Sequence, residues 1–165
     1  MWTIVKIDKK KLNFFKDDLT KKLGSKCIFY SPKLIVQKYK NTKLINKEFH
    51  LLGDYIFCFH NEFRNPLTIC KLKFTKGLKY FLNGFSQSQN EISDFVTKCK
   101  EAENQKGYLS INFFDLQNNK NYKFASGPFT EKIFKIINLQ KNNIEILIGN
   151  IKTKINKKKF LINPI

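Results

Sequence analysis

Period-two alternation of apolar and polar residues predicts most of the strands in the first part of the chain. Residues 2–7 follow this pattern, and residues 53–59 place Tyr55, Phe57 and Phe59 on one face of a strand. The second face of that strand, with Ile56 and Cys58, is apolar too. The strand is therefore either central in a sheet or carries a binding face. Further strands are expected at residues 26–30, as a pair within 33–49 around a turn near Asn41-Thr42, and at 78–82.

Apolar residues three or four positions apart predict three helices. One runs from Leu12 to Leu23, with Asp8 as its candidate N-cap and Gly24 just after its end. A short helix is expected at residues 66–74, and a third helix follows the capping box of residues 88–91. Helices mixed with strands in this way indicate an α+β domain over residues 1–103, with an antiparallel sheet flanked by helices.

The pattern changes after a polar stretch that predicts a linker at residues 104–112. Beyond it, short β-prone runs alternate with turn signals such as Ser126-Gly127-Pro128. Ile144, Ile146 and Ile148 stand at every second position, as residues on one face of a strand do. Several short strands in so small a segment indicate an all-β barrel over residues 113–165, because closure leaves no sheet edge exposed.

The charge of the chain favours an anionic partner. It has 31 Lys and Arg residues against 13 Asp and Glu, a formal net charge of +18, and the excess is spread over both predicted domains. Nucleic acid is the commonest polyanion that such a protein meets. Arg64 is the single arginine, which argues against dense reading of bases. The alternative is that the richness in Lys, Asn, Ile and Phe is a by-product of AT-rich coding.

Few residues in the chain have the chemistry of a catalytic centre. The four cysteines form no Cys-x-x-Cys pair, the two histidines stand in no metal-binding pattern, and phosphate-loop and nucleophile-elbow motifs are absent. Cys58 and His60 have the spacing of a dyad on one strand face, but no third group marks it. We expect a non-enzymatic protein without metal or cofactor.

Targeting signals are also missing from the sequence. No apolar run approaches the roughly 20 residues of a membrane-spanning helix. Lysines at positions 6, 9, 10 and 11 interrupt any apolar signal-peptide segment near the N-terminus. The cysteine pattern fits a reducing compartment. We expect a cytoplasmic protein that does not bind membranes.

Three features of the sequence are candidates for binding a partner. One is the aromatic strand with Tyr55 and Phe57, and another is the turn Gly127-Pro128-Phe129. The remaining feature is a set of lysines: Lys9, Lys10, Lys11, Lys71, Lys73 and Lys76. Those at the start of the first helix oppose its dipole, which favours an external anionic partner. Each feature also has a purely structural explanation. The aromatic residues can belong to the core, the lysines can simply be solvated, and Phe129 can fill the interior of the barrel.

Four short motifs, in this order, resemble the NusG family of transcription elongation factors, including its RfaH-type paralogues. Met1-Trp2-Thr3-Ile4-Val5 is similar to the opening tryptophan strand of the family. Residues 51–57 resemble its "LFPGY(V/L)F" strand, and residues 77–84 resemble "GVxxFVxG". Gly127-Pro128-Phe129 resembles the "GPF" that opens the KOW motif. The resemblance covers nearly the whole chain and implies an NGN domain followed by a KOW domain with an SH3-like barrel.

The resemblance implies a bacterial elongation, termination or antitermination factor that acts as a monomer. The NGN domain of the family binds the clamp helices of RNA polymerase through an apolar depression, and the matching positions here are Trp2, Tyr55, Phe57 and Phe81. The lysine set would lie near upstream or non-template DNA. The KOW domain of the family binds Rho or a small-subunit ribosomal protein, and the matching positions are Gly127, Pro128, Phe129 and Lys132.

Departures from the family pattern favour a divergent paralogue. Gly53 stands where proline is usual, and Glu131, Lys132 and Phe134 replace the later residues of the KOW loop, which puts Rho and ribosome recruitment in doubt. An RNA- or ribosome-binding KOW protein without polymerase binding is the alternative. Apolar residues of 133–151 also recur at helical spacing, so a helical packing of this segment is a second hypothesis.

Overall fold

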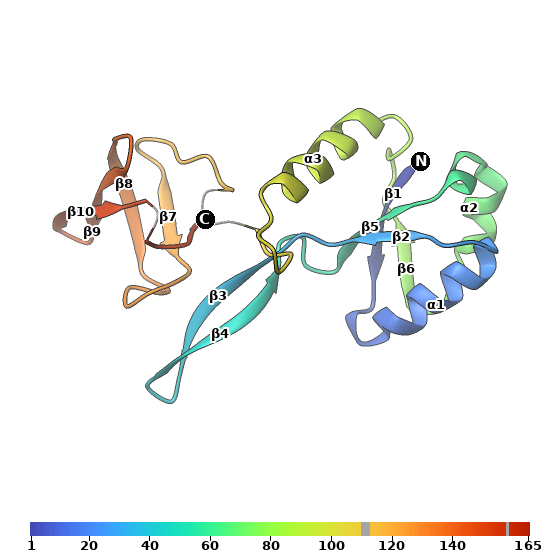
Figure 1. Cartoon of the computed structure of the whole chain (residues 1–165), viewed down its shortest axis with the longest axis horizontal. Coiled ribbons are helices and arrows are strands. Elements are labelled where there is room, and N and C mark those ends of the chain that lie inside the picture. The colour runs from blue at the N-terminus through green and yellow to red at the C-terminus, as the bar shows by residue number, and fades with distance from the viewer. Residues whose placement is uncertain (110–112, 158) are drawn as a thin grey trace. The chain divides into compact units, whose positions relative to one another are not determined.

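The computed structural model describes residues 1–109, 113–157 and 159–165 (Figure 1). The chain forms two compact units, unit 1 with residues 1–32 and 50–101, and unit 2 with residues 33–49 and 102–165. Residues 33–49 thus group with the C-terminal part of the chain, whereas the sequence placed them in a domain of residues 1–103. The predicted linker 104–112 lies partly outside the described residues.

Unit 1 is built on a four-stranded antiparallel sheet with the order β2-β5-β1-β6. Its strands confirm the period-two predictions: β1 (Trp2–Ile7), β2 (Ile28–Tyr30), β5 (Tyr55–Phe59) and β6 (Leu78–Phe81). Strand β5, which was predicted either to be central or to carry a binding face, lies between β2 and β1. Cross-strand partners include Ile4 with Phe57 and Lys6 with Tyr55. The β1–β6 register places Lys6 beside Tyr80 as well.

The three helices predicted in unit 1 are present, although Asp8 caps a short 3-10 turn before the first of them and not the α-helix itself. The elements are α1 (Leu12–Leu23), α2 (Pro66–Leu72), α3 (Gln89–Glu101) and two 3-10 turns, η1 (Lys9–Lys11) and η2 (Asn61–Arg64). The Asp8 side chain accepts a hydrogen bond from the Lys10 N–H at the start of η1. Gly24 closes α1 with a φ of 70°, in the left-handed region where glycine meets no steric penalty. No helix among the described residues is long and apolar enough to span a membrane.

Helices cover both faces of the unit 1 sheet, as the α+β prediction required (Figure 1). On one face, Val5 and Ile7 of β1 pack with Phe15 of α1 and Leu72 of α2. On the other face, Phe57 packs against residues of α3. Since α3 is a single helix on a four-stranded sheet, part of this second face stays open.

Unit 2 contains a five-stranded antiparallel sheet with the order β10-β9-β8-β7-β11. Its strands are β7 (Asn121–Phe124), β8 (Ile133–Leu139), β9 (Asn143–Ile148), β10 (Ile151–Asn156) and β11 (Ile162–Pro164). Phe124, Phe134, Ile144 and Ile146 form its core, as the strict alternation of the isoleucines predicted. Residues 133–151 are strands here and not a helical hairpin, and closure into an SH3-like barrel stays a prediction.

A two-stranded ribbon completes unit 2. Its strands β3 (Lys33–Lys40) and β4 (Lys43–His50) form a separate sheet joined by the turn at Asn41 and Thr42. Both turn residues have positive φ, 47° and 64°, as a two-residue hairpin loop requires. The predicted strand pair and its turn are therefore confirmed.

Candidate binding surfaces

One row of side chains stays partly accessible to solvent on the sheet face that α3 covers in unit 1. The strand register places Tyr55, Lys6 and Tyr80 next to one another across β5, β1 and β6. The two tyrosine hydroxyls lie 2.8 Å apart, and their rings meet edge to face at 6.4 Å between centroids. In the next row, Leu82 is exposed and Ile4 is half-buried. We call these five residues the open face.

A lysine ammonium lies over two aromatic rings in the open face. The Lys6 Nζ is 5.3 Å from the ring centroid of Tyr55 and 5.8 Å from that of Tyr80. Both phenols raise the pKa of Lys6, so this residue stays charged. The bond between the hydroxyls raises the pKa of Tyr55 and lowers that of Tyr80, since it stabilises the phenolate that accepts it. The surface thus presents aromatic edges, aliphatic groups and one cation.

The other predicted polymerase-binding residues are packed inside unit 1. Phe57 is only 3% exposed and lies beneath Ile92 and Val96 of α3. Trp2 is half-buried, with its ring edge-on to that of Phe57 at 6.4 Å. Phe81 is buried on the opposite face of the sheet, in the core beside α2. This corrects the predicted set, because strand alternation turns Phe81 away from Tyr55 and Phe57.

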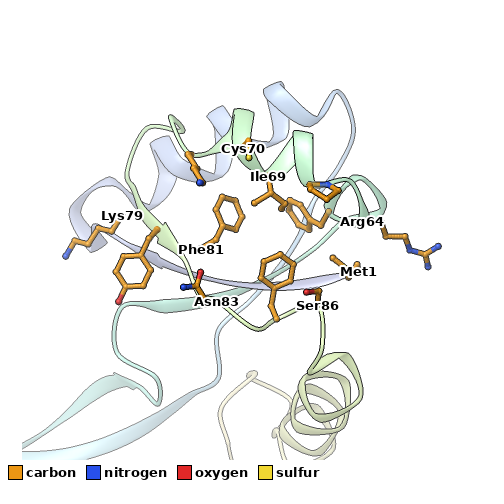
Figure 2. Close-up of a pocket in the computed structure, with 13 residues that line it drawn as sticks. Met1, Arg64, Ile69, Cys70, Lys79, Phe81, Asn83 and Ser86 are labelled. Carbon is orange, nitrogen blue, oxygen red and sulfur yellow. The ribbon is translucent and has the colours of Figure 1, made fainter.

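A pocket of about 570 Å³ opens between α2, β6 and the segment after β6 (Figure 2). Its walls are mainly apolar, with Ile69 from α2 and Phe81 from β6 pointing into it. Arg64 and Lys79 extend outward at two sides of its mouth. Burial, and then the nearby Arg64, lower the pKa of the Met1 amino group at its edge. All charged side chains that line the pocket are basic, so it fits an apolar group that carries an acidic neighbour.

The structure brings two of the predicted lysine groups of unit 1, lysines 9–11 and Lys76, together. The Asp8 N–H donates to the Gly77 carbonyl at 2.8 Å, and a Cβ added to Gly77 would lie 3.0 Å from Lys11. The Lys76 N–H donates to Asp18 Oδ2 at 2.8 Å, and this bond lowers the pKa of Asp18. Lysines 9–11 therefore lie beside Lys76.

The remaining predicted lysines flank an exposed aromatic ring. Lys71 lies on α2, and Lys73 caps its C-terminal end. Phe74 follows with 86% of its surface exposed, and its carbonyl accepts a bond from Lys22 Nζ. One lysine of the set is already paired, since Lys9 Nζ lies 3.3 Å from Asp54. We call lysines 9, 10, 11 and 76 the lysine surface; Lys71 and Lys73 line two separate pockets.

The predicted KOW turn lies against the ribbon in unit 2. The Gly127 N–H donates to Gln37 Oε1 at 2.7 Å, and Thr130 Oγ1 donates to the Gln37 carbonyl at 2.7 Å. Tyr39 OH donates to the Pro128 carbonyl at 3.4 Å. Gly127 has a φ of 81°, and a Cβ there would come within 2.7 Å of the Phe160 ring. Phe129 and Lys132 stay exposed, so they are the accessible part of the predicted site.

Several residues of these surfaces were not predicted from the sequence, although strand alternation could have indicated some of them. Lys6 and Tyr80 belong to predicted strands, and alternation from Trp2 places Lys6 on the face of Trp2 and Ile4. Gln37 left no signal, because its contacts with the Gly127 turn come from distant sequence. Within the described ranges, no three His, Cys, Asp or Glu side chains are placed to hold a metal ion.

Comparisons with known proteins give matches among solved structures. No protein-family model matches the sequence, and a search of curated proteins finds no match. NusG of Thermotoga maritima is similar over 99% of this chain and 96% of its own, at 15% identity and a TM-score of 0.33. The MjSpt4:Spt5 complex is similar over 100% of this chain and 98% of its own, at 9% identity and a TM-score of 0.30. Both TM-scores are low, so these two likenesses carry no argument about function.

Proposed function

We propose that this protein is a transcription elongation factor that binds RNA polymerase through the open face of unit 1. The observation that carries the proposal is the row of half-buried Tyr55 and Lys6 with exposed Tyr80, continued by exposed Leu82. Tyrosines and a cation beside aliphatic groups are typical of the centre of a protein interface. Two of the motifs that resemble the NusG family, residues 51–57 and 77–84, supply Tyr55, Tyr80 and Leu82.

The open face fits an amphipathic helical partner with an acidic edge. Apolar side chains of such a helix would pack on Ile4, Tyr80 and Leu82, as in helix-in-groove recognition. An acidic side chain would approach Lys6, whose ammonium already lies over two rings. The clamp helices of the polymerase are the partner that the family resemblance implies. The bond between the tyrosine hydroxyls uses one of their two O–H donors, so a partner that covers them must accept a hydrogen bond from the other.

The lysine surface supports a second contact, with upstream or non-template DNA. Lys10, Lys11 and Lys76 are exposed; Lys11 precedes α1, and Lys76 lies beside α1, where its N–H bonds Asp18. Lysines contact phosphates as point charges, so this affinity would be tolerant of sequence and would fall with salt. Phe74 offers an exposed ring on which an unpaired base can stack.

The Gly127 turn supports a third contact, with Rho or a small-subunit ribosomal protein. Phe129 is 43% exposed and lies beside the rings of Phe124 and Phe160. Lys132 is exposed close by in the sequence. Phe129 is the part of the turn best placed to anchor a partner, because Gly127 and Pro128 already bond the ribbon.

Binding to purified bacterial core RNA polymerase at physiological salt tests the proposal. The test variant is Tyr55→Ala/Tyr80→Ala, which removes the open rings and leaves Phe57 in the core. The matched control is Phe14→Ala/Phe74→Ala, which removes two exposed rings elsewhere in unit 1. We expect at least tenfold weaker binding for the test variant, since two central interface tyrosines are worth about 2 kcal/mol or more. Equal binding of both variants would contradict the proposal.

An RNA- or ribosome-binding protein without polymerase binding is the second candidate. It is favoured by one observation, the burial of Phe57 beneath α3, which reduces the apolar area open to a protein partner. Under this hypothesis both variants would bind polymerase equally or not at all. Moderate salt would then abolish any residual binding, because only lysines would hold it.

A further inference from the structure

The ribbon of unit 2 is exposed along the whole of its outer half. Each residue from Lys38 to Phe49 is exposed to solvent, and β3 and β4 pair only with each other in the described sheets. Figure 1 shows the two strands as a long ribbon with its turn at the free end. An element of this shape can enter a groove of another molecule without rearrangement of a core.

Four lysines share one face of this ribbon. Side chains alternate along a strand, so Lys38 and Lys40 lie on one face of β3, and Lys43 and Lys47 on one face of β4. A two-residue turn makes Lys40 and Lys43 direct cross-strand neighbours, which point to the same side. The bond of 3.1 Å between Gln37 Nε2 and Asn46 Oδ1 confirms this register. We call lysines 38, 40, 43 and 47 the lysine face.

No acidic side chain in residues 38–47 offsets the positive charge of the lysine face near the turn. Lys38 Nζ lies 3.6 Å from Glu131, a half-exposed pair of little strength. In the described part of the chain, no ion pair joins an acidic side chain to Lys40, Lys43 or Lys47. Four like charges on one small face repel one another, so an external polyanion relieves that repulsion.

We infer that the lysine face is a second nucleic-acid site, which places the ribbon in the major groove of a DNA duplex. The major groove of B-form DNA, about 12 Å wide, admits a two-stranded β-ribbon. The major groove of an RNA duplex is too narrow for side chains to read. Lysines two residues apart on a strand are about 6.6–6.8 Å from each other, so they reach successive points along the groove walls.

The side chains of the ribbon favour duplex DNA over a single strand. Single strands bind to exposed aromatic platforms that lie among the basic residues. Between its lysines the lysine face carries Ile45 and no aromatic residue. Phe49, an exposed ring on the same face of β4, lies beyond Lys47 at the inner end of the ribbon, and Tyr39 points to the other face and bonds Pro128. The ribbon has no arginine, the best reader of guanine, so we expect binding that tolerates any sequence.

Fluorescence anisotropy of the full chain with a labelled DNA duplex of mixed sequence tests the inference. The test variant is Lys40→Gln/Lys43→Gln. The matched control is Lys152→Gln/Lys154→Gln, which removes two exposed lysines from one face of β10. We expect the test variant to bind about 10- to 30-fold more weakly, and its salt slope to fall by about 1.8, since each phosphate contact contributes about 0.9. The control should keep the wild-type slope.

Further measurements separate this site from the lysine surface of unit 1. The labelled single strand and an RNA duplex of the same sequence should bind more weakly than the DNA duplex. Lys10→Gln/Lys11→Gln tests the lysine surface without touching the ribbon. The inference is overturned if the wild type does not bind the duplex, or if it prefers the single strand or RNA. It is overturned as well if the control loses as much affinity as the test variant, or if only the Lys10/Lys11 variant does. Polymerase binding is measured separately, so failure of the proposed function does not affect this outcome.

Discussion

Replacing Phe57 by alanine should destabilise unit 1 strongly, although the sequence marks this ring as a binding residue. Full burial of a phenylalanine is worth about 1.5–3 kcal/mol, and its exposed fraction here is 3%. Its ring also packs against those of Trp2, Tyr30 and Phe95, at 6.4, 6.2 and 5.7 Å between centroids. Such ring pairs add about 0.5–1.5 kcal/mol each. With the cavity that truncation leaves, we expect a loss of about 3–5 kcal/mol in the free energy of unfolding.

Urea unfolding followed by tryptophan fluorescence measures this loss. Trp2 is the single tryptophan of the chain and contacts the Phe57 ring, so its emission reports on unit 1. The midpoint should fall while the slope against urea stays constant, which indicates a change in stability alone. Phe74→Ala is the matched control, because that ring is 86% exposed and its loss should change stability by less than about 0.5 kcal/mol.

A small effect of Phe57→Ala would refute the reasoning. A loss below about 1 kcal/mol is too small for a buried phenylalanine and would mean that α3 does not hold Phe57 in solution. Phe57 would then join the open face and enlarge its apolar area. If the free energy of unfolding falls by the expected amount of about 3–5 kcal/mol, binding assays must use variants of Tyr55 and Tyr80. A Phe57 variant could then lose binding because it unfolds and not because a contact is missing.

Three further predictions concern unit 1. Gly77→Ala should lower stability by about 1–3 kcal/mol in thermal unfolding, more than Gly53→Ala, because both have positive φ but only Gly77 has a backbone oxygen 3.0 Å from the added Cβ. Asp18→Asn should cost about 1 kcal/mol at neutral pH. Asp18 has a lowered pKa, so this difference should be full above its unfolded pKa of about 3.9 and vanish as the pH falls through the folded value; a difference that persists in acid would contradict it. In ultraviolet titration, Tyr80 should ionise below the usual phenol pKa of about 10, and Tyr55→Phe should raise that pKa again; an unchanged titration would show that the two hydroxyls do not bond in solution.

Much of the fold follows from local signals in the sequence. The strands of unit 1 and the turn at Asn41-Thr42 appear where alternation and turn residues place them, because these signals act within a few residues. Asp8 and Gly24 bound the first helical segment for the same reason. Alternation also correctly puts Tyr55 and Phe57 on one strand face.

Tertiary packing decided which of those residues reach solvent. Alternation cannot say that α3 buries Phe57 and leaves Tyr55 half-buried, because the cover comes from residues far along the chain. Nor can it pair Lys6 with Tyr80, since the register between β1 and β6 depends on how the whole sheet assembles.

The charged surfaces show the same division. The sequence by itself determined that lysines are abundant and that two strands carry Lys38, Lys40, Lys43 and Lys47 within residues 33–49. Only the tertiary structure decided that Lys11 lies beside Gly77 and Lys76, and that the inner part of the ribbon meets the Gly127 turn. The physical reason is range: propensity, capping and alternation depend on neighbours in sequence, whereas exposure and charge clustering depend on contacts between distant segments.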